Sequence, residues 1–193
     1  MPTLLINLLI LFFSFISIFG QAQKPRLIIP SGHTNPVVSI TLDRHEKIMA
    51  TAEQTISIKL WDVETRKELY SFNGHAEAVN DVAFSPTENL LASTSDDKSI
   101  IIWNLQRAAK QSSFTGHTDA VTRVKFSLDG TQVISASFDG TIKLWNVADA
   151  TLLRDIAIGN PIHSLALSPQ DEYFSCGTRS GDLVLFLPEP ATE

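Results

Sequence analysis

Histidine, serine, aspartate and tryptophan recur in this sequence at regular intervals, and together these side chains can form a hydrogen-bonded relay. Gly-His pairs place His33, His75 and His117 42 residues apart, and each histidine precedes a tryptophan by 28 residues. A carboxylate can accept the imidazole N–H, a hydroxyl can bridge, and a buried indole N–H needs an acceptor. Chance is a poor explanation for two landmarks that keep a constant spacing, so we interpret them as parts of one repeated unit.

The repeat divides most of the chain into four units, which we place at approximately residues 32–72, 74–114, 116–158 and 159–187. Within a unit, short runs rich in β-branched residues are separated by turn sequences such as "SLDG" and "FDG". These runs predict four strands per unit and show no helical periodicity. Because a four-stranded sheet cannot bury both of its faces alone, we expect the units to stack face to face around an axis.

The second and third units resemble the WD-repeat β-propeller family: a Gly-His pair, then a serine and an aspartate, then a strand that ends in Trp-Asn. The resemblance covers about residues 27–187 and implies an all-β fold whose blades each have four antiparallel strands. It also implies a buried polar network in each blade. Carried over position by position, the network consists of His75, Ser93, Asp97 and Trp103 in unit two, His117, Ser135, Asp139 and Trp145 in unit three, and His33, Thr51 and Trp61 in unit one.

The outer units depart from the family pattern. Thr55 stands in unit one where the family has aspartate, so we expect the first blade to lack the carboxylate. Unit four has Asn160, Cys176, Ser180 and Phe186 at the positions of histidine, serine, aspartate and tryptophan. Terminal repeats are often atypical, so a blade is still expected there with a weaker network.

The resemblance further implies a partner-binding face, because WD-repeat propellers often bind partners at one face of the ring. Two positions per blade recur on that face: the residue before the turn aspartate, and one near the start of the innermost strand. The first set is Gln54, Asp96, Phe138 and Arg179, and the second is Val38, Asn80, Thr122 and His163. Each could singly be a solvated turn residue.

Phe138 is the expected anchor of this face, because an aromatic side chain in a polar turn gains nothing from water and suits a contact with a partner. We therefore expect Phe138→Ala to change stability by no more than about 0.5 kcal/mol while weakening partner capture.

The sequence gives little support for a catalytic, metal-binding or nucleic-acid-binding function. Three of the five histidines belong to the repeat, and Cys176 is the single cysteine, which excludes an internal disulfide and a cysteine-based metal site. "GTRSG" (residues 177–181) has its serine one place too late for a nucleophile elbow. The net charge of −6 and the lack of a basic cluster argue against a nucleic-acid partner. We therefore expect a chain that is not an enzyme and has no catalytic, cofactor-binding or metal-binding residues.

The N-terminal segment differs in kind from the repeats. Residues 4–20 are nearly all apolar and run into Gly20-Gln21-Ala22, which is typical of a signal peptide cut after Ala22. The n-region "MPT" has no lysine or arginine, and an uncleaved anchor is the alternative, although the run is shorter than the roughly 20 residues of a spanning helix. We expect residues 1–22 to be removed and the chain to be secreted or periplasmic, in a bacterium because the chain lacks disulfides.

The expected function is an exported, non-enzymatic interaction scaffold that occupies residues 23–187 and binds a protein or peptide. The alternative is the recognition propeller of a larger exported enzyme whose catalytic domain is absent from this chain, with residues 188–193 as a proline-containing linker or tail. Residues 26–30 are expected to form an outer strand that completes the fourth blade. Propellers have about 4–8 blades and WD-repeat rings usually about seven. Either two chains form an eight-bladed homodimeric ring, or the chain is part of a longer propeller.

Overall fold

The computed structural model describes residues 32–170 and 173–186, which belong to one compact unit. The expected signal peptide, the expected closing strand at residues 26–30 and the tail from residue 187 lie outside the described residues. Within the described residues, no helix is long and apolar enough to cross a membrane.

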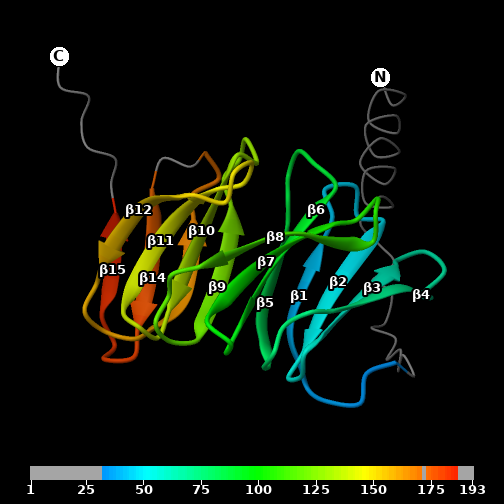
Figure 1. Ribbon diagram of the computed structural model, residues 1–193, viewed down its shortest axis with the longest axis horizontal. Helices are drawn as coiled ribbons and strands as arrows, with labels where there is room; N and C mark the ends of the chain where they lie inside the picture. Colours follow the sequence, from blue (N-terminus) through cyan, green and yellow to red (C-terminus); the bar gives the residue numbers. More distant parts are fainter. Residues whose placement is uncertain (1–31, 171–172, 187–193) are drawn as a thin grey trace, which may run out of the picture. The chain divides into compact units, whose positions relative to one another are not determined.

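The described residues form fifteen β-strands in four antiparallel sheets, and no helix (Figure 1). The first sheet contains β1 (Val37–Leu42), β2 (Ile48–Glu53), β3 (Ser57–Asp62) and β4 (Glu68–Asn73). The second contains β5 (Val79–Phe84), β6 (Leu90–Ser95), β7 (Ser99–Asn104) and β8 (Ala109–Thr115). The third contains β9 (Val121–Phe126), β10 (Gln132–Ser137), β11 (Thr141–Asn146) and β12 (Leu152–Ala157), and the fourth contains β13 (Ile162–Leu167), β14 (Phe174–Thr178) and β15 (Leu183–Phe186).

Strands that are consecutive in the chain are neighbours in each sheet, so every sheet is a simple up-and-down blade. Tight turns make this possible. The turn between the second and third strands places Lys98 at φ 69° in the second blade and Gly140 at φ 78° in the third. Glycine adopts this left-handed conformation without strain, which explains the Asp-Gly sequence of the third blade. The predicted all-β fold with one blade per repeat is confirmed.

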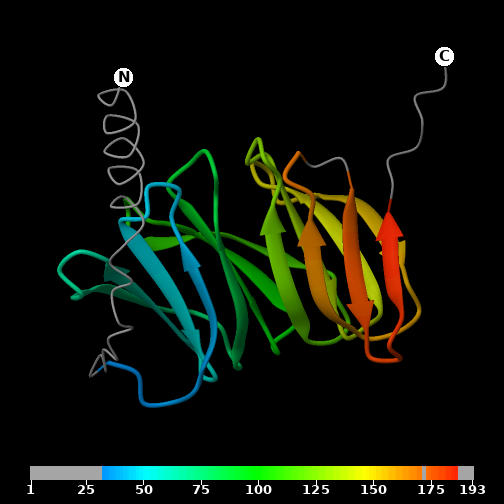
Figure 2. The same ribbon diagram turned by 180° about the vertical axis from the view of Figure 1, so that it is seen from behind.

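Neighbouring blades pack face to face through apolar side chains. At each junction, a residue from the third strand of one blade shares a core cluster with a residue from the innermost strand of the next blade: Ile58 with Val82, Ile100 with Val124, and Ile142 with Leu165. The innermost strands β1, β5, β9 and β13 consequently lie side by side, as the view from behind shows (Figure 2). The first and fourth blades are at opposite ends of this row.

Candidate functional site

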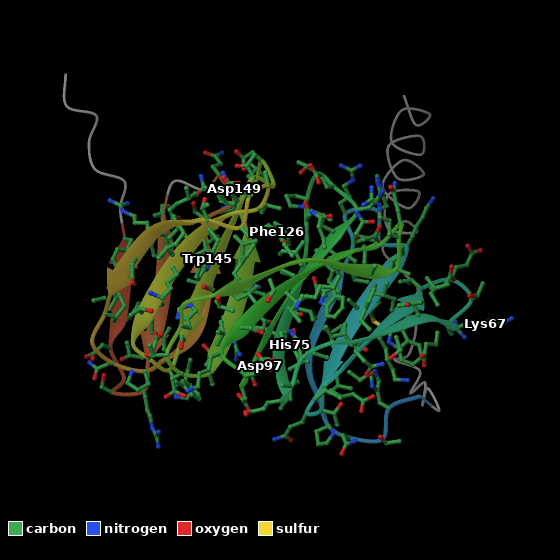
Figure 3. The ribbon with its side chains drawn as sticks, viewed as in Figure 1. Lys67, His75, Asp97, Phe126, Trp145 and Asp149 are labelled. Carbon is green, nitrogen blue, oxygen red and sulfur yellow. The ribbon has the colours of Figure 1, made fainter. Side chains whose placement is uncertain are left out.

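The second blade brings its four predicted network residues together. The indole Nε1–H of Trp103 donates to Ser93 Oγ at 2.8 Å, and Ser93 Oγ lies 2.8 Å from His75 Nε2. The other ring nitrogen, His75 Nδ1, lies 2.9 Å from Asp97 Oδ2. Because Ser93 already accepts the indole hydrogen, we assign its own hydrogen to Nε2, so that the imidazole donates from Nδ1 to the carboxylate. Figure 3 shows His75 and Asp97 near the same ends of the strands.

The third blade repeats this relay with nearly the same distances. Trp145 Nε1–H donates to Ser135 Oγ at 2.9 Å, which lies 2.8 Å from His117 Nε2, and His117 Nδ1 lies 2.8 Å from Asp139 Oδ2. The constant spacing in the sequence therefore corresponds to one hydrogen-bonding arrangement built twice.

The glycine before the histidine is part of the same arrangement. A Cβ atom added at Gly74 would lie 2.7 Å from Cη2 of Trp103, which is closer than real Cβ contacts. The indole ring thus lies against the backbone of the Gly-His pair, and the spacing between this pair and the tryptophan reflects that contact.

The charges of the relay are set by burial and hydrogen bonds. Burial lowers the pKa of His75 and of His117, and this effect outweighs the opposing attraction of the adjacent carboxylates. Burial opposes ionisation of Asp97 and Asp139, but the hydrogen bonds that each carboxylate accepts outweigh burial and hold its pKa below the usual range. For Asp97 these bonds come from Ser99, the backbone of Ala76 and the histidine. At neutral pH the relay therefore contains a neutral imidazole and an ionised carboxylate.

Serine, histidine and aspartate contact one another in the same sequence as in a catalytic triad. Whether the serine can act as a nucleophile depends on whether a substrate can reach its hydroxyl. Ser93 and Ser135 are fully buried, and each hydroxyl is shared between an indole and an imidazole. A nucleophile must reach a substrate carbonyl, which these buried oxygens do not. The relay therefore holds strands together within a blade. Among the described residues, no group of three or more histidine, cysteine or acidic side chains is arranged to hold a metal ion.

The first blade corrects the expectation that it lacks a carboxylate. His33 Nδ1 pairs with Glu53, and His33 Nε2 lies 2.7 Å from Thr51 Oγ1, which accepts the Trp61 indole N–H at 2.8 Å. Glu53 lies at the end of β2, two residues before Thr55, and its longer side chain replaces the turn aspartate. The only sequence signal was an acidic residue in a strand at a position where the second and third blades have serine.

The fourth blade has lost the relay, as its sequence indicated. Among the described residues, no hydrogen bond joins Asn160, Cys176 and Ser180. Instead Ser180, at the aspartate position, donates to Asp182, which occupies the position of Thr141 in the third blade. The hydroxyl and the carboxylate have thus exchanged places, because Thr141 donates to Asp139 in the third blade. Burial raises the pKa of the Cys176 thiol.

The eight positions predicted for the partner-binding face are of two kinds in the structure. Four are exposed: Val38, Gln54, His163 and Arg179. The others are half-buried or buried and carry internal contacts: Asn80, Asp96, Thr122 and Phe138.

Asn80 and Thr122 are engaged within the protein. Asn80 Nδ2 donates to Asp96 Oδ1 at 2.7 Å and to the backbone oxygen of Val121 in the next blade at 3.1 Å. Thr122 is buried, and its Oγ1 donates to the backbone oxygens of Ala136 and Ile162. The expectation that Thr122 faces a partner is therefore wrong, because its hydroxyl links its own blade to the fourth.

Phe138 also differs from its expected role as a free aromatic anchor. Its ring packs edge-on against the ring of His163 in the next blade, with centroids 4.8 Å apart, and it is half-buried. Aromatic pairs of this geometry contribute about 0.5–1.5 kcal/mol beyond their buried area. Phe138 therefore contributes to a junction between blades, and this contact leads us to expect a loss of stability for Phe138→Ala rather than a neutral effect.

A buried carboxylate that the sequence reasoning did not single out connects three blades. Asp81 lies on β5, and its Oδ1 accepts a hydrogen bond from Ser39 Oγ of β1 at 2.6 Å. Its Oδ2 accepts the backbone N–H of Val124 on β9 at 3.0 Å. A polar residue in an innermost strand, 42 positions after Ser39, was the available signal.

A hollow of about 450 Å³ lies at the other ends of the innermost strands, away from the predicted face. Its lining includes Thr41, Ala83, Lys125 and Ala166, which occupy the same position in the innermost strands of the four blades. Figure 3 shows Phe126, which also lines the hollow, toward the opposite strand ends from Asp97. The predicted face and the hollow are therefore two separate surfaces.

Comparison with known proteins agrees with this geometry. Residues 66–104 and 109–146 match the family model for "WD40: WD domain, G-beta repeat". Each match contains the outer strand of one blade and the first three strands of the next blade, and ends at the Trp-Asn pair. Two segments of this chain thus match the WD40 repeat, and its four sheets resemble the blades of WD40 propellers. A comparison with curated proteins gives no match.

Two solved structures share the fold. "Crystal structure of RRP9 WD40 repeats" is 25% identical with a TM-score of 0.74, over 83% of this chain and 53% of that chain. "Structure of U3-55K" is 26% identical with a TM-score of 0.71, over 83% of this chain and 54% of that chain. This chain therefore matches about half the length of each solved chain.

Proposed function

We propose that the protein is a non-enzymatic interaction scaffold that captures a protein or peptide on the face formed by the turns between the second and third strands. One observation carries this proposal: exposed side chains occur on this face at equivalent positions of different blades. Gln54 and Arg179 occupy the same position in the first and fourth blades, and Val38 and His163 share the second position. In the first three blades, relays that include a buried hydroxyl and indole hold the turns of this face, so the surface residues vary over a repeated framework.

We also propose that the protein is exported. The support is the apolar run at residues 4–20 followed by Gly20-Gln21-Ala22. Expression in a bacterial host and intact-mass measurement of the exported chain test this proposal. We expect a mature chain that begins at Gln23; a mass that retains residues 1–22 would instead indicate an anchor.

A second candidate function is the recognition part of a larger exported enzyme. Its support is the proline-containing sequence of residues 188–193, which is typical of a linker. Sequencing the reading frame downstream of residue 193 distinguishes the two, because a hydrolase-like domain there would assign the chemistry to that domain.

Arg179 offers a direct test of the binding face. The immobilised protein is incubated with the extracellular protein fraction of its source organism, and the captured proteins are quantified by mass spectrometry. We expect Arg179→Ala to lower the capture of specific partners several-fold. Arg154→Ala is the matched control, because Arg154 is an exposed arginine of β12 on the outer strand of the third blade. Equal capture by the wild type and both variants would contradict the proposed face.

A further inference from the structure

The junctions inside the chain follow one pattern. Each blade turns alternate residues of its third strand toward the following blade, and residues of its innermost strand toward the preceding one. At the junction between the third and fourth blades, Ile142 is 0% exposed and Leu165 is buried against the same core. At the junction between the first two blades, Val82 is 2% exposed. A blade therefore presents two different apolar faces, one on each side.

The first blade exposes the face that elsewhere receives a preceding blade. Ile40 occupies the position of Val82 and is 63% exposed, and Val37 and Leu42 beside it on β1 are also exposed. We call these three residues the leading face. Lys59 belongs to the same side of this blade and pairs with Glu68 at 2.7 Å. The equivalent lysine of the third blade is Lys143, which pairs with Asp155 and is buried where two blades pack together. A lysine at the position of Lys59 is therefore compatible with another blade packed on the leading face.

The fourth blade exposes the other kind of face. Leu183 occupies the position of Ile142 and is 80% exposed, and Leu185, two residues further along β15, is 54% exposed. We call these two residues the trailing face. Inside the chain, the same positions are covered by the following blade. The row of blades thus has a different apolar face at each end. The leading face has no preceding blade packed on it, and the trailing face has no following blade packed on it.

We propose that a second copy of this chain covers both faces, with the trailing face of each chain packed on the leading face of the other. This inference rests on the propeller-like fold and deepens the proposed scaffold function, because it names a partner. The contact is heterologous, since two different faces meet, and two such contacts related by a twofold rotation close into a ring. Burial of the exposed leucine and isoleucine side chains provides the driving force.

A second copy fits these faces in extent as well as in chemistry. Two copies supply eight blades, which is within the range of about 4–8 known for propellers. Each solved structure is about twice as long as the matched part of this chain, so two copies correspond in extent to one such chain. Every copy carries both kinds of face that such a junction requires.

Light scattering of the exported chain in detergent-free buffer tests the proposal, because a detergent would itself cover the apolar faces. We expect the mass of two chains for the wild type. Ile40→Glu and Leu183→Glu should each lose the two-chain species, because each places a charge in both junctions. Leu153→Glu is the matched control: Leu153 is an exposed leucine of β12 outside both faces, and this variant should keep the wild-type mass.

Mixing the two face variants gives the sharpest result. A dimer of Ile40→Glu with Leu183→Glu has one doubly substituted junction and one wild-type junction, so the two-chain species should return in part only in the mixture. Circular dichroism checks that each variant keeps its strands. A double variant Ile40→Cys, Leu183→Cys should also be linked into a covalent dimer by a short bis-maleimide, and neither single variant should be.

Three outcomes would overturn the proposal: a wild-type monomer, which would leave the faces to another polypeptide; a wild-type mass of more than two chains; and a dimer that survives both Ile40→Glu and Leu183→Glu.

Discussion

At the scale of single residues, the first blade shows that a relay can keep its chemistry while changing its residues. Glu53 replaces the turn aspartate from two positions earlier, and Thr51 replaces the serine that receives the indole N–H. What the blade requires is a carboxylate at Nδ1 and a hydroxyl at Nε2. The carboxylate or the hydroxyl can come from any backbone position from which the side chain reaches the imidazole ring.

Glu53→Ala should therefore destabilise the protein by about 1–3 kcal/mol, because it leaves the partly buried imidazole N–H of His33 without its acceptor. Thr55→Ala should cost less, since Thr55 Oγ1 accepts only a long bond from the Ser57 N–H at 3.3 Å. Gln54→Ala, at an exposed position between them, is the control and should stay within about 0.5 kcal/mol. Urea unfolding of the three variants gives the comparison, and equal losses at Glu53 and Thr55 would contradict the assignment of the carboxylate.

The relays also predict how stability depends on pH. Folding lowers the pKa of His75 and His117 below their ordinary value of 6.5, so the unfolded chain binds more protons as the pH falls. Their contribution is present above pH 6.5 and is lost as the pH falls through the lower pKa of the folded state. Protonation would also remove the acceptor of the serine hydroxyl.

Urea unfolding at a series of pH values from 7.5 downward should thus show stability falling below pH 6.5. His117→Asn should flatten part of this fall, because one of the two titrating imidazoles is gone. A second fall is expected below pH 3.8, where Asp97 and Asp139, whose pKa values are also lowered, become protonated. Stability that is constant between pH 7.5 and 5 would contradict the neutral imidazole.

At the scale of elements, the innermost strands are joined by more than apolar packing. Asp81 accepts bonds from both neighbouring blades, and Thr122 donates to the fourth. A polar group buried at a junction costs free energy unless it is paired, so each of these contacts requires the next blade to be in place. The blades are therefore coupled through β1, β5, β9 and β13.

Asp81→Ala should cost about 1–3 kcal/mol, because the Ser39 hydroxyl and the Val124 N–H both lose their acceptor. Ser39→Ala removes one of these contacts and should cost about 1 kcal/mol. The double variant should cost less than the sum, with a coupling energy between about 0.5 and 3 kcal/mol, because both changes remove the same hydrogen bond. Chemical unfolding measures all three, and strictly additive losses would show that the blades are not coupled here.

At the scale of the whole molecule, the feature with the largest consequence for stability is the pair of exposed apolar surfaces, the leading face and the trailing face. If a second copy covers them, stability depends on how much of the protein is dimeric, and the Tm should rise with chain concentration. Calorimetry over a roughly hundred-fold range of concentration should show this rise for the wild type and for Leu153→Glu. The Tm of Leu183→Glu should stay constant, because this variant does not form the junction. A wild-type Tm that is independent of concentration would argue against the second copy.

The sequence alone determined the repeat and the four strands of a blade, and its resemblance to the WD-repeat family implied the relays of the second and third blades. These features are periodic: Trp103 and Trp145 occupy one place in a unit that is repeated, and the alternation of apolar residues within a strand is local. A pattern that recurs every 42 residues shows which side chains share a role even before the chain is folded.

Tertiary structure decided the contacts that cross from one blade to the next. Glu53 can replace an aspartate because its longer side chain extends from β2 to His33. Thr122 is buried because the fourth blade lies against it. Phe138 is held by His163, and Ile40 is exposed while its equivalent Val82 is buried. Ile40 and Val82 are both apolar and occupy equivalent positions, so the sequence does not distinguish them. Only the presence or absence of a neighbouring blade makes one a core residue and the other a surface residue.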